Sequence, residues 1–233
     1  MPVKMTPIEP AARDALLVGD PRRAFALAQE LTVQPRMSHQ ARGLWGYNGS
    51  TGSGLALTVQ STGVGGPSAA PVIGDLASQG VSRMIRLGTC LALDADLGAG
   101  TVLLVERSVI ADGAARILTG GEDFARPDPA LFAALEGLGR SATVSSHDLV
   151  ARYEPSAASD PGPATARDLQ TAATLAMGRR LGVQSGAVLI VAEDASGTRL
   201  EEPELWDLFR SAGKAVVSRL ERLGTNPKAK VEG

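Results

Sequence analysis

Short runs of apolar residues alternate along this chain with longer segments in which apolar residues recur every three or four positions. The short runs predict β-strands and the amphipathic segments predict α-helices. The expected strands cover residues 15–18, 43–47, 55–60, 83–87, 101–105, 142–146 and 186–191. The expected helices cover residues 22–31, 67–79, 128–138, 167–181 and 202–223. This alternation is typical of an α/β protein in which helices cover both faces of one sheet.

Turn signals refine this picture of the sheet. The segments Asn48-Gly49 and Gly52-Ser53-Gly54 indicate antiparallel pairing around them, so the sheet is expected to be mixed. Residues 154–165 are rich in Pro, Ser, Ala and Gly and predict a long loop, and residues 224–233 predict a frayed tail. A chain of 233 residues with 44% hydrophobic content suffices for one large core, and we expect a single domain over residues 1–233.

Composition narrows the classes of partner. The formal net charge of −2 and the pI near 5.8 give no bulk electrostatic reason to bind nucleic acid or an anionic membrane, so a small molecule is the expected partner. The single cysteine excludes an intramolecular disulfide framework, and no Cys/His cluster has metal-ligand spacing. The first apolar run, residues 15–18, is too short for a membrane span or a signal sequence. We therefore expect a cytoplasmic protein without a metal.

Two strand ends carry the most informative residues. The strand over residues 55–60 runs into Ser-Thr-Gly-Val-Gly-Gly-Pro-Ser at positions 61–68, and such a glycine-rich turn lets backbone amides approach an anion. Arg86 ends the next apolar strand, where a charge requires an anionic ligand or an ion-pair partner. If these strands are parallel, Arg86 lies beside the turn. The pattern indicates a phosphate site, with a buried ion pair as the alternative interpretation of Arg86.

Three other groups of polar residues are less specific. Gly19 to Arg23 follows the first strand, where open α/β sheets bind ligands, but taken alone it is more simply an Asp-Pro turn that caps a helix. Arg42, taken alone, is most simply a surface charge. The pair Glu193-Asp194 closes a late strand and is either a general acid or an exposed turn.

Four motifs, taken together and in order, resemble the nucleoside phosphorylase family, which includes uridine phosphorylase and the hexameric bacterial purine nucleoside phosphorylases. They are GDPRRA at 19–24, STGVGGPS at 61–68, IRLGTC at 85–90, and the strand that ends in Glu193-Asp194. The resemblance extends from Val18 to about Leu223. It implies a three-layer α/β/α sandwich around a mixed, partly barrel-like β-sheet.

The resemblance also implies roles for individual residues. It implies that phosphate is bound by Gly19, Arg23, Arg42, Arg86 and Thr89. Within this set, Arg42 would reach the site from a neighbouring subunit, which implies a homo-oligomer with the dimer as its minimal unit and a hexamer as the expected assembly. The nucleoside would be bound by Cys90, Leu91, Asp168, Leu169 and Gln170. Arg86 and Asp194 would be catalytic, Asp194 by donating to the leaving base, and inorganic phosphate would be a co-substrate, with no cofactor.

The implied activity is phosphorolysis of a nucleoside to free base and pentose 1-phosphate. Two departures from the family pattern affect the nucleoside half of the site: Gln170 replaces a glutamate that binds ribose, and Leu91 replaces a glycine. Two alternatives follow. One is a nucleosidase that uses water, and the other is a catalytically weak protein that binds phosphate or a nucleotide. Arg152 and Tyr153 are further candidates for reading the base.

Overall fold

The computed structural model describes residues 8–153 and 162–224, so most of the predicted loop at 154–165 and nearly all of the predicted tail lie outside the described residues. The strands are β1 (Asp14–Val18), β2 (Val33–His39), β3 (Gly46–Ser50), β4 (Ala56–Ser61), β5 (Arg83–Ala92), β6 (Val102–Ala111), β7 (Phe124–Ala125), β8 (Arg140–His147), β9 (Ala166–Asp168) and β10 (Gln184–Glu193). The α-helices are α1 (Pro21–Leu31), α2 (Gly66–Ser78), α3 (Gly113–Thr119), α4 (Pro129–Leu135), α5 (Thr171–Leu181) and α6 (Glu202–Gly224). Two short 3₁₀ turns, η1 (Ala41–Gly43) and η2 (Ala151–Tyr153), complete the described elements.

All the described strands belong to one mixed sheet, part of which closes on itself. Its order is β10-β6-β8-β9-β5-β1-β4-β3-β2, with β7 paired to β6. Because β10 also pairs with β5, the strands β5, β9, β8, β6 and β10 form a closed barrel, and β1 to β4 extend from it as an open sheet. The expected mixed, partly barrel-like sheet is confirmed.

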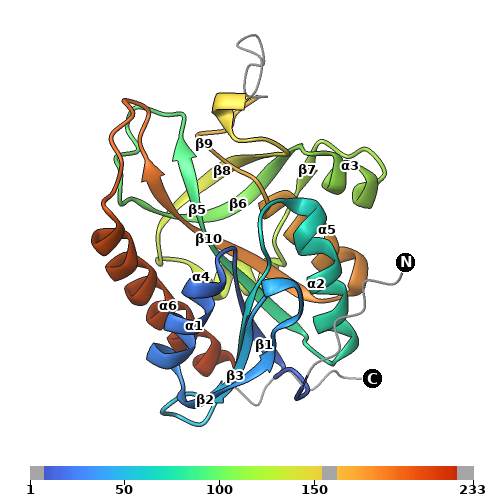
Figure 1. Cartoon of the computed structure of the whole chain (residues 1–233). Coiled ribbons are helices and arrows are strands. Elements are labelled where there is room, and N and C mark those ends of the chain that lie inside the picture. Colours follow the sequence, from blue (N-terminus) through green and yellow to red (C-terminus); the bar gives the residue numbers. More distant parts are fainter. Residues whose placement is uncertain (1–7, 154–161, 225–233) are drawn as a thin grey trace.

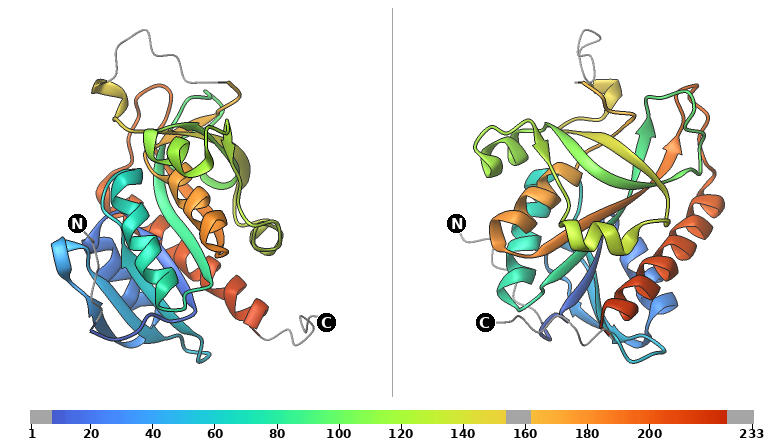
Figure 2. Two further views of the ribbon diagram at one scale, coloured as in Figure 1. Left: turned by 90° about the vertical axis from the view of Figure 1, so that its right-hand side faces the viewer. Right: turned by 180° about the vertical axis from the view of Figure 1, so that it is seen from behind.

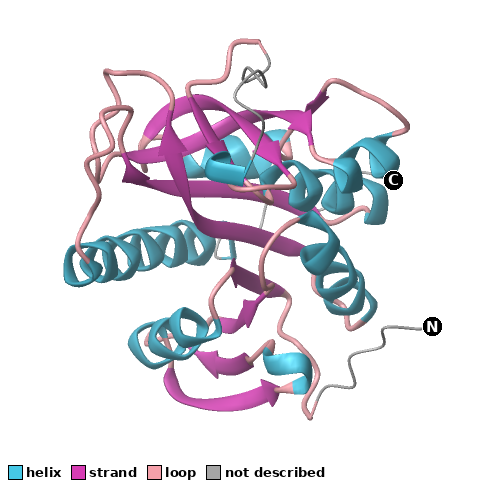
Figure 3. Ribbon diagram, turned by 45° about the horizontal axis from the view of Figure 1, so that its top comes forward, coloured by secondary structure: helices cyan, strands magenta, loops and turns pink. Residues whose placement is uncertain are grey.

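Helices cover both faces of this sheet, as Figures 1 to 3 show. Successive side chains of β1 point to opposite faces of the sheet. Leu16 and Val18 belong to the core under α1, α4 and α6, whereas Ala15 and Leu17 pack beneath α2. Helix α5 lies beside α2, and α3 packs against α5. The barrel holds a separate apolar interior that includes Leu103, Val144 and Leu189. The α/β/α arrangement is therefore confirmed.

The differences from the sequence prediction lie where elements are short or polar. The hairpin around Asn48-Gly49 is confirmed by the antiparallel pairing of β3 with β4, but the expected strand at 43–47 begins only at Gly46. Strands β2, β7 and β9 and helix α3 were not expected from periodicity. Helix α5 begins at Thr171 rather than at residue 167, because residues 166–168 pair as β9 with β5 and β8.

No helix in the described part of the chain combines the length and the apolar character that crossing a membrane requires.

The close packing of α5 on the sheet gives a test of the fold. A Cβ atom added at Gly178 would lie 2.5 Å from Ser185 Cβ and 3.0 Å from the Val183 carbonyl oxygen. We expect Gly178→Ala to lower the free energy of unfolding by about 1–3 kcal/mol, because an extra methyl group in a filled space forces the backbone to shift. Urea denaturation followed by circular dichroism measures this change.

A matched control is Gly74→Ala in α2. The nearest atom to its added Cβ would be Met177 Cε at 3.7 Å, an ordinary contact. This variant should keep or gain stability, by up to about 1 kcal/mol, since alanine restricts the unfolded chain. Equal losses in both variants would contradict the packing described for α5.

Candidate functional site

A cavity of about 710 Å³ opens where β1, β4 and β5 end. Strand β1 runs parallel to β4 on one side and to β5 on the other, with Leu17 level with Arg86 and Val18 level with Ser61, so their carboxyl ends meet at one edge. Most of the predicted site residues line this cavity: Gly19, Arg23, Arg86, Thr89, Cys90, Leu91, Asp168, Leu169 and Gln170. The parallel pairing assumed for the glycine turn and Arg86 is confirmed, with β1 between them.

One end of the cavity offers backbone amides. Gly19, Val64 and Gly65 line it, and within the described residues their N–H groups donate no hydrogen bond. Gly65 holds the turn open with φ of 81°, a conformation that favours glycine, and it precedes the thirteen-residue helix α2 without a side-chain cap. Free amides and a helix N-terminus attract an anion.

Arg23 adds a positive charge at this end. Its guanidinium lies 4.4 Å from the centre of the Phe209 ring, and among the described residues it has no hydrogen bond or ion pair. Burial lowers the pKa of Arg23, partly offset by the charge of Asp20, although an arginine remains protonated at neutral pH. A partly desolvated cation without a carboxylate partner favours an anionic ligand.

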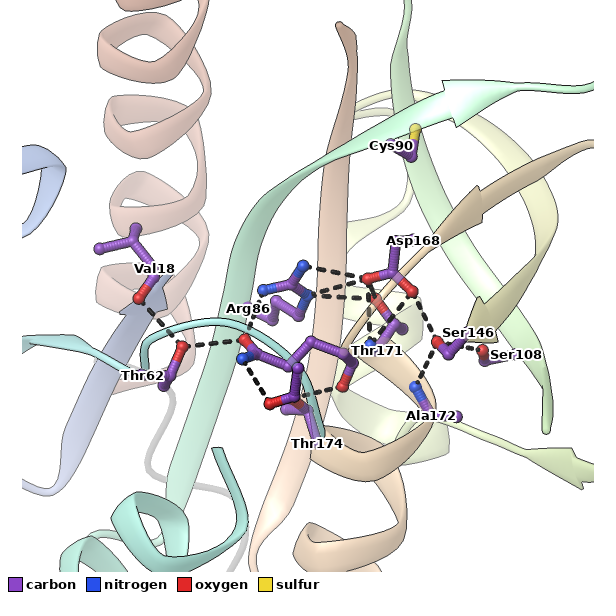
Figure 4. Close-up of polar contacts among 12 residues, drawn as sticks. Val18, Thr62, Arg86, Cys90, Ser108, Ser146, Asp168, Thr171, Ala172 and Thr174 are labelled. Atoms are coloured by element: carbon purple, nitrogen blue, oxygen red, sulfur yellow. Dashed lines mark hydrogen bonds and ion pairs between the residues drawn. The ribbon is translucent and has the colours of Figure 1, made fainter. Parts of the chain in front are cut away.

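Arg86 is held differently. It is only 6% exposed, and its Nη2 and Nε atoms lie 3.0 Å and 3.2 Å from Asp168 Oδ2, so the interpretation as a buried ion pair is confirmed (Figure 4). Its Nη1 donates to Gln170 Oε1 at 2.7 Å. A guanidinium carries five N–H groups, so one remains on Nη1 and one on Nη2 for a ligand.

The space for this guanidinium depends on a glycine two residues further along β5. A Cβ atom at Gly88 would lie 2.7 Å from Arg86 Nη2 and 2.8 Å from its Cζ. The glycine in the Arg86-Leu87-Gly88 sequence therefore leaves the space in which the arginine side chain lies across the strand.

Asp168 is the centre of a buried polar network at the start of α5. Its side chain is fully buried, and Oδ1 accepts from Ser146 Oγ at 2.5 Å while Oδ2 accepts from Thr171 Oγ1 at 2.6 Å and from the Thr171 amide at 3.0 Å. Ser146 also accepts from the Ala172 amide at 2.8 Å (Figure 4). These bonds join β8, β9 and the first turn of α5.

Gln170 connects this network to the glycine turn. Its Oε1 accepts from Arg86, and it lies 2.8 Å from Thr62 Oγ1, whose single proton is shared with the Val18 carbonyl at 3.0 Å. Its Nε2 donates to the carbonyl oxygens of Gly63 and Gly65 at 3.2 Å and 3.1 Å.

The opposite end of the cavity contains residues outside the predicted phosphate-binding and nucleoside-binding sets. They are Val150, Ala151, Arg167, Glu193 and Arg199, together with the candidate Arg152. Glu193 and Arg199 form an ion pair at 2.7 Å. Arg167 is buried on β9 at the level of Leu91 on β5. A three-residue strand has no periodicity that could have revealed it.

Two predicted residues do not line the cavity. The Asp194 carboxylate faces its own loop, where it accepts from Ser196 Oγ at 2.7 Å and from the amides of Ser196 and Thr198 at 2.9 Å. These hydrogen bonds lower the pKa of Asp194, that from the Ser196 side chain most of all. Arg42 lies exposed on η1 with φ of 59° and points to no group of its own cavity. Of the predicted pair Glu193-Asp194, it is Glu193 that lines the cavity.

Comparisons with known proteins agree with this geometry. Residues 13–226 match the family model of the phosphorylase superfamily. The chain is 35% identical over 111 residues to a purine nucleoside phosphorylase of the DeoD type from Oceanobacillus iheyensis, and 35% identical over 115 residues to one from Clostridium novyi. These alignments cover 47% and 49% of the chain and equal shares of the two relatives, so the match spans about half of their length.

A solved structure resembles the whole fold. The crystal structure of purine nucleoside phosphorylase from Toxoplasma gondii in complex with immucillin-H superposes with a TM-score of 0.78 at 18% sequence identity. The superposition covers 91% of this chain and 93% of that one. At this level of identity the likeness concerns the fold.

The environment of Cys90 gives a test of the cavity. The thiol is buried, and this desolvation raises its pKa, with a smaller contribution from the negative charge of Asp168. A raised pKa keeps the thiol protonated, so even at pH about 8.5, where a free cysteine is half ionised, we expect almost no thiolate. Ellman's reagent should react slowly with the native protein and rapidly after denaturation in guanidinium chloride. Complete reaction of the native protein during mixing would contradict the burial of Cys90.

Proposed function

Because the chain belongs to the phosphorylase superfamily, we propose that it cleaves the N-glycosidic bond of a nucleoside with inorganic phosphate, giving free base and pentose 1-phosphate. The observation that carries this proposal is the unpaired, partly desolvated Arg23 in the same cavity as the free amides of Gly19, Val64 and Gly65. A cation and convergent amides favour a multiply charged oxyanion.

Phosphate would lie at this end of the cavity, with the Thr89 hydroxyl and the two remaining N–H groups of Arg86 as further donors. The fixed donors would hold the nucleophile in line with the anomeric carbon. As the glycosidic bond breaks, the sugar gains positive charge, which the adjacent phosphate would stabilise.

The leaving base would occupy the end of the cavity lined by Leu91, Arg167 and the Glu193–Arg199 pair. We assign the contact with the leaving base to Glu193 and Arg199 rather than to Asp194. Glu193 and Arg199 line the cavity, whereas the Asp194 carboxylate does not and is hydrogen-bonded within its own loop. The names of the two bacterial relatives make a purine nucleoside the first substrate to test.

One observation favours hydrolysis as a second candidate. Asp168 already balances the charge of Arg86, which leaves Arg23 as the uncompensated arginine of the anion end. A water nucleophile needs fewer cationic donors than phosphate does. The dependence of base release on phosphate separates these two reactions.

We also propose a cytoplasmic homo-oligomer in which Arg42 completes the phosphate site of a neighbouring subunit. Arg42 is exposed on η1, and among the described residues it has no hydrogen bond or ion pair. A left-handed backbone conformation at a non-glycine residue costs free energy, which supports a functional reason for this exposed arginine.

The direct test is base release from purine and pyrimidine nucleosides, followed by absorbance, with and without inorganic phosphate. We expect release that requires phosphate. In Arg23→Met the KM for phosphate should rise about tenfold to a hundredfold, because a hydrogen bond from a charged donor contributes about 1.5–3 kcal/mol. Methionine retains the apolar contact with Phe209.

Arg22→Met is the matched control, since Arg22 is exposed, pairs with Glu202 at 2.9 Å and does not line the cavity. Its KM for phosphate should equal that of the unaltered protein. Base release that is independent of phosphate would show that the reaction is hydrolysis and not phosphorolysis. A lack of release from every nucleoside, with thermal stabilisation by phosphate, would indicate a binding protein.

Arg42→Ala tests the assembly. If Arg42 serves a neighbouring subunit, the variant should keep the oligomeric state in size-exclusion chromatography and show a KM for phosphate raised by about tenfold. Mixing Arg42→Ala with Arg23→Met protomers should restore part of the activity, because a mixed oligomer contains some sites with both arginines. A monomer with an unchanged KM for phosphate would reject this arrangement.

A further inference from the structure

Gln170 lies at the junction of the two parts of the cavity. It precedes α5, it contacts the glycine turn at Gly63 and Gly65, and it contacts Arg86 on β5. The glycine turn, β5 and the start of α5 therefore meet at this one side chain, which is only 2% exposed.

The orientation of the Gln170 amide follows from its neighbours. Arg86 can only donate, so it must face the amide oxygen, and the carbonyl groups of Gly63 and Gly65 can only accept, so they must face the nitrogen. Both amide hydrogens therefore have partners within the protein. The amide oxygen accepts from Arg86 and shares the single Thr62 proton with the Val18 carbonyl, so little hydrogen-bonding capacity remains for a ligand.

Asp168 is similarly occupied. Its carboxylate accepts from Arg86, Ser146 and Thr171, and its side chain is fully buried. Neither polar residue of the segment Asp168-Leu169-Gln170 thus presents a free acceptor to the hydroxyl groups of a sugar.

We infer that Gln170 is a positioning residue, which ties the glycine turn to Arg86 and so sets the geometry of the anion end, rather than a residue that binds the sugar. This inference rests on the proposed function. It explains why an amide is present at this position: a glutamate could accept from Arg86 and Thr62, but it has no hydrogen to donate to the two glycine carbonyls. An ionised glutamate would also repel both carbonyl oxygens.

The first variant for the test is Gln170→Met, which keeps the approximate volume, adds no charge and removes all these hydrogen bonds. We expect the Kd for inorganic phosphate, measured by calorimetry, and the KM for phosphate to rise by at least about tenfold, because displaced donors lose alignment with the anion. The KM for the nucleoside should stay within about threefold of the original value. Gln170→Glu should show the same loss.

The opposite pattern would overturn the inference. If Gln170→Glu keeps its affinity for phosphate and lowers the KM for the nucleoside, residue 170 reads the sugar. Thr62→Val provides a second, milder variant should Gln170→Met fail to fold, because Thr62 does not line the cavity and contacts Gln170 from the other side. If the single variants Thr62→Val and Gln170→Glu both keep their affinity for phosphate, the positioning role is also rejected.

Gln184→Met is the matched control. Gln184 begins β10 at the far end from the cavity, where its Nε2 donates to Asp128 Oδ1 at 3.1 Å. The variant loses a hydrogen bond of the same kind, and its Kd for phosphate should not change.

Hydrogen exchange separates this inference from the proposed function, since it requires no ligand. The amides of Thr62 and Gly63 are protected by the carbonyls of Val18 and Gly19 at 2.8 Å and 3.1 Å, and Gln170→Met should accelerate their exchange relative to the Gln184 amide. If the unaltered protein binds no phosphate, the proposed function is wrong and these exchange rates alone decide the role of Gln170. Unchanged rates would then overturn it.

Discussion

The buried charge of Arg86 constrains more of this protein than any other single group. A guanidinium removed from water requires a balancing charge and partners for its N–H groups, and breaking such a pair by deleting one member typically costs about 3–5 kcal/mol. Asp168 supplies that charge from β9, and it can do so only because Ser146 and Thr171 fix its carboxylate. The short strand β9, the start of α5 and the glycine at position 88 all lie in contact with this one side chain.

The two arginines of this end of the cavity differ in how their charges are balanced. Arg86 is neutralised by Asp168 and contributes orientation more than net charge, whereas Arg23 and the free amides of the turn supply the uncompensated positive potential. The geometry of this end of the cavity therefore depends on the backbone of the glycine turn, which is hydrogen-bonded to Gln170. A polar network of this kind stabilises one arrangement strongly when each member is satisfied.

The sequence allowed the main elements, and the meeting of Gly19, the glycine turn and Arg86 at one cavity, to be predicted, because those features rest on local patterns. Apolar runs identified β1, β4 and β5, and parallel pairing then brought Gly19, the glycine turn and Arg86 to one edge. The base end could not be predicted in the same way. Arg167 lies on a strand of three residues, and Glu193 rather than Asp194 reaches the cavity because hydrogen bonds within the following loop turn the Asp194 carboxylate away. The four contacts of Gln170 could not be predicted either, because they join segments far apart in the sequence.

Strand β5 belongs to two structures at once. Along its first residues it pairs with β1 in the open sheet, and at its end it pairs with β9 in the barrel, while β10 follows it along most of its length. The anion end of the cavity is consequently built largely on the open sheet and the opposite end on the barrel, and among the described strands β5 alone is common to both. Substitutions in the loop after β10, where Arg199 pairs with Glu193, change one end of the cavity, whereas the contacts of Gly19, the glycine turn and Arg86 stay as they are. A protein built in this way can change one end of its cavity during evolution and keep the other.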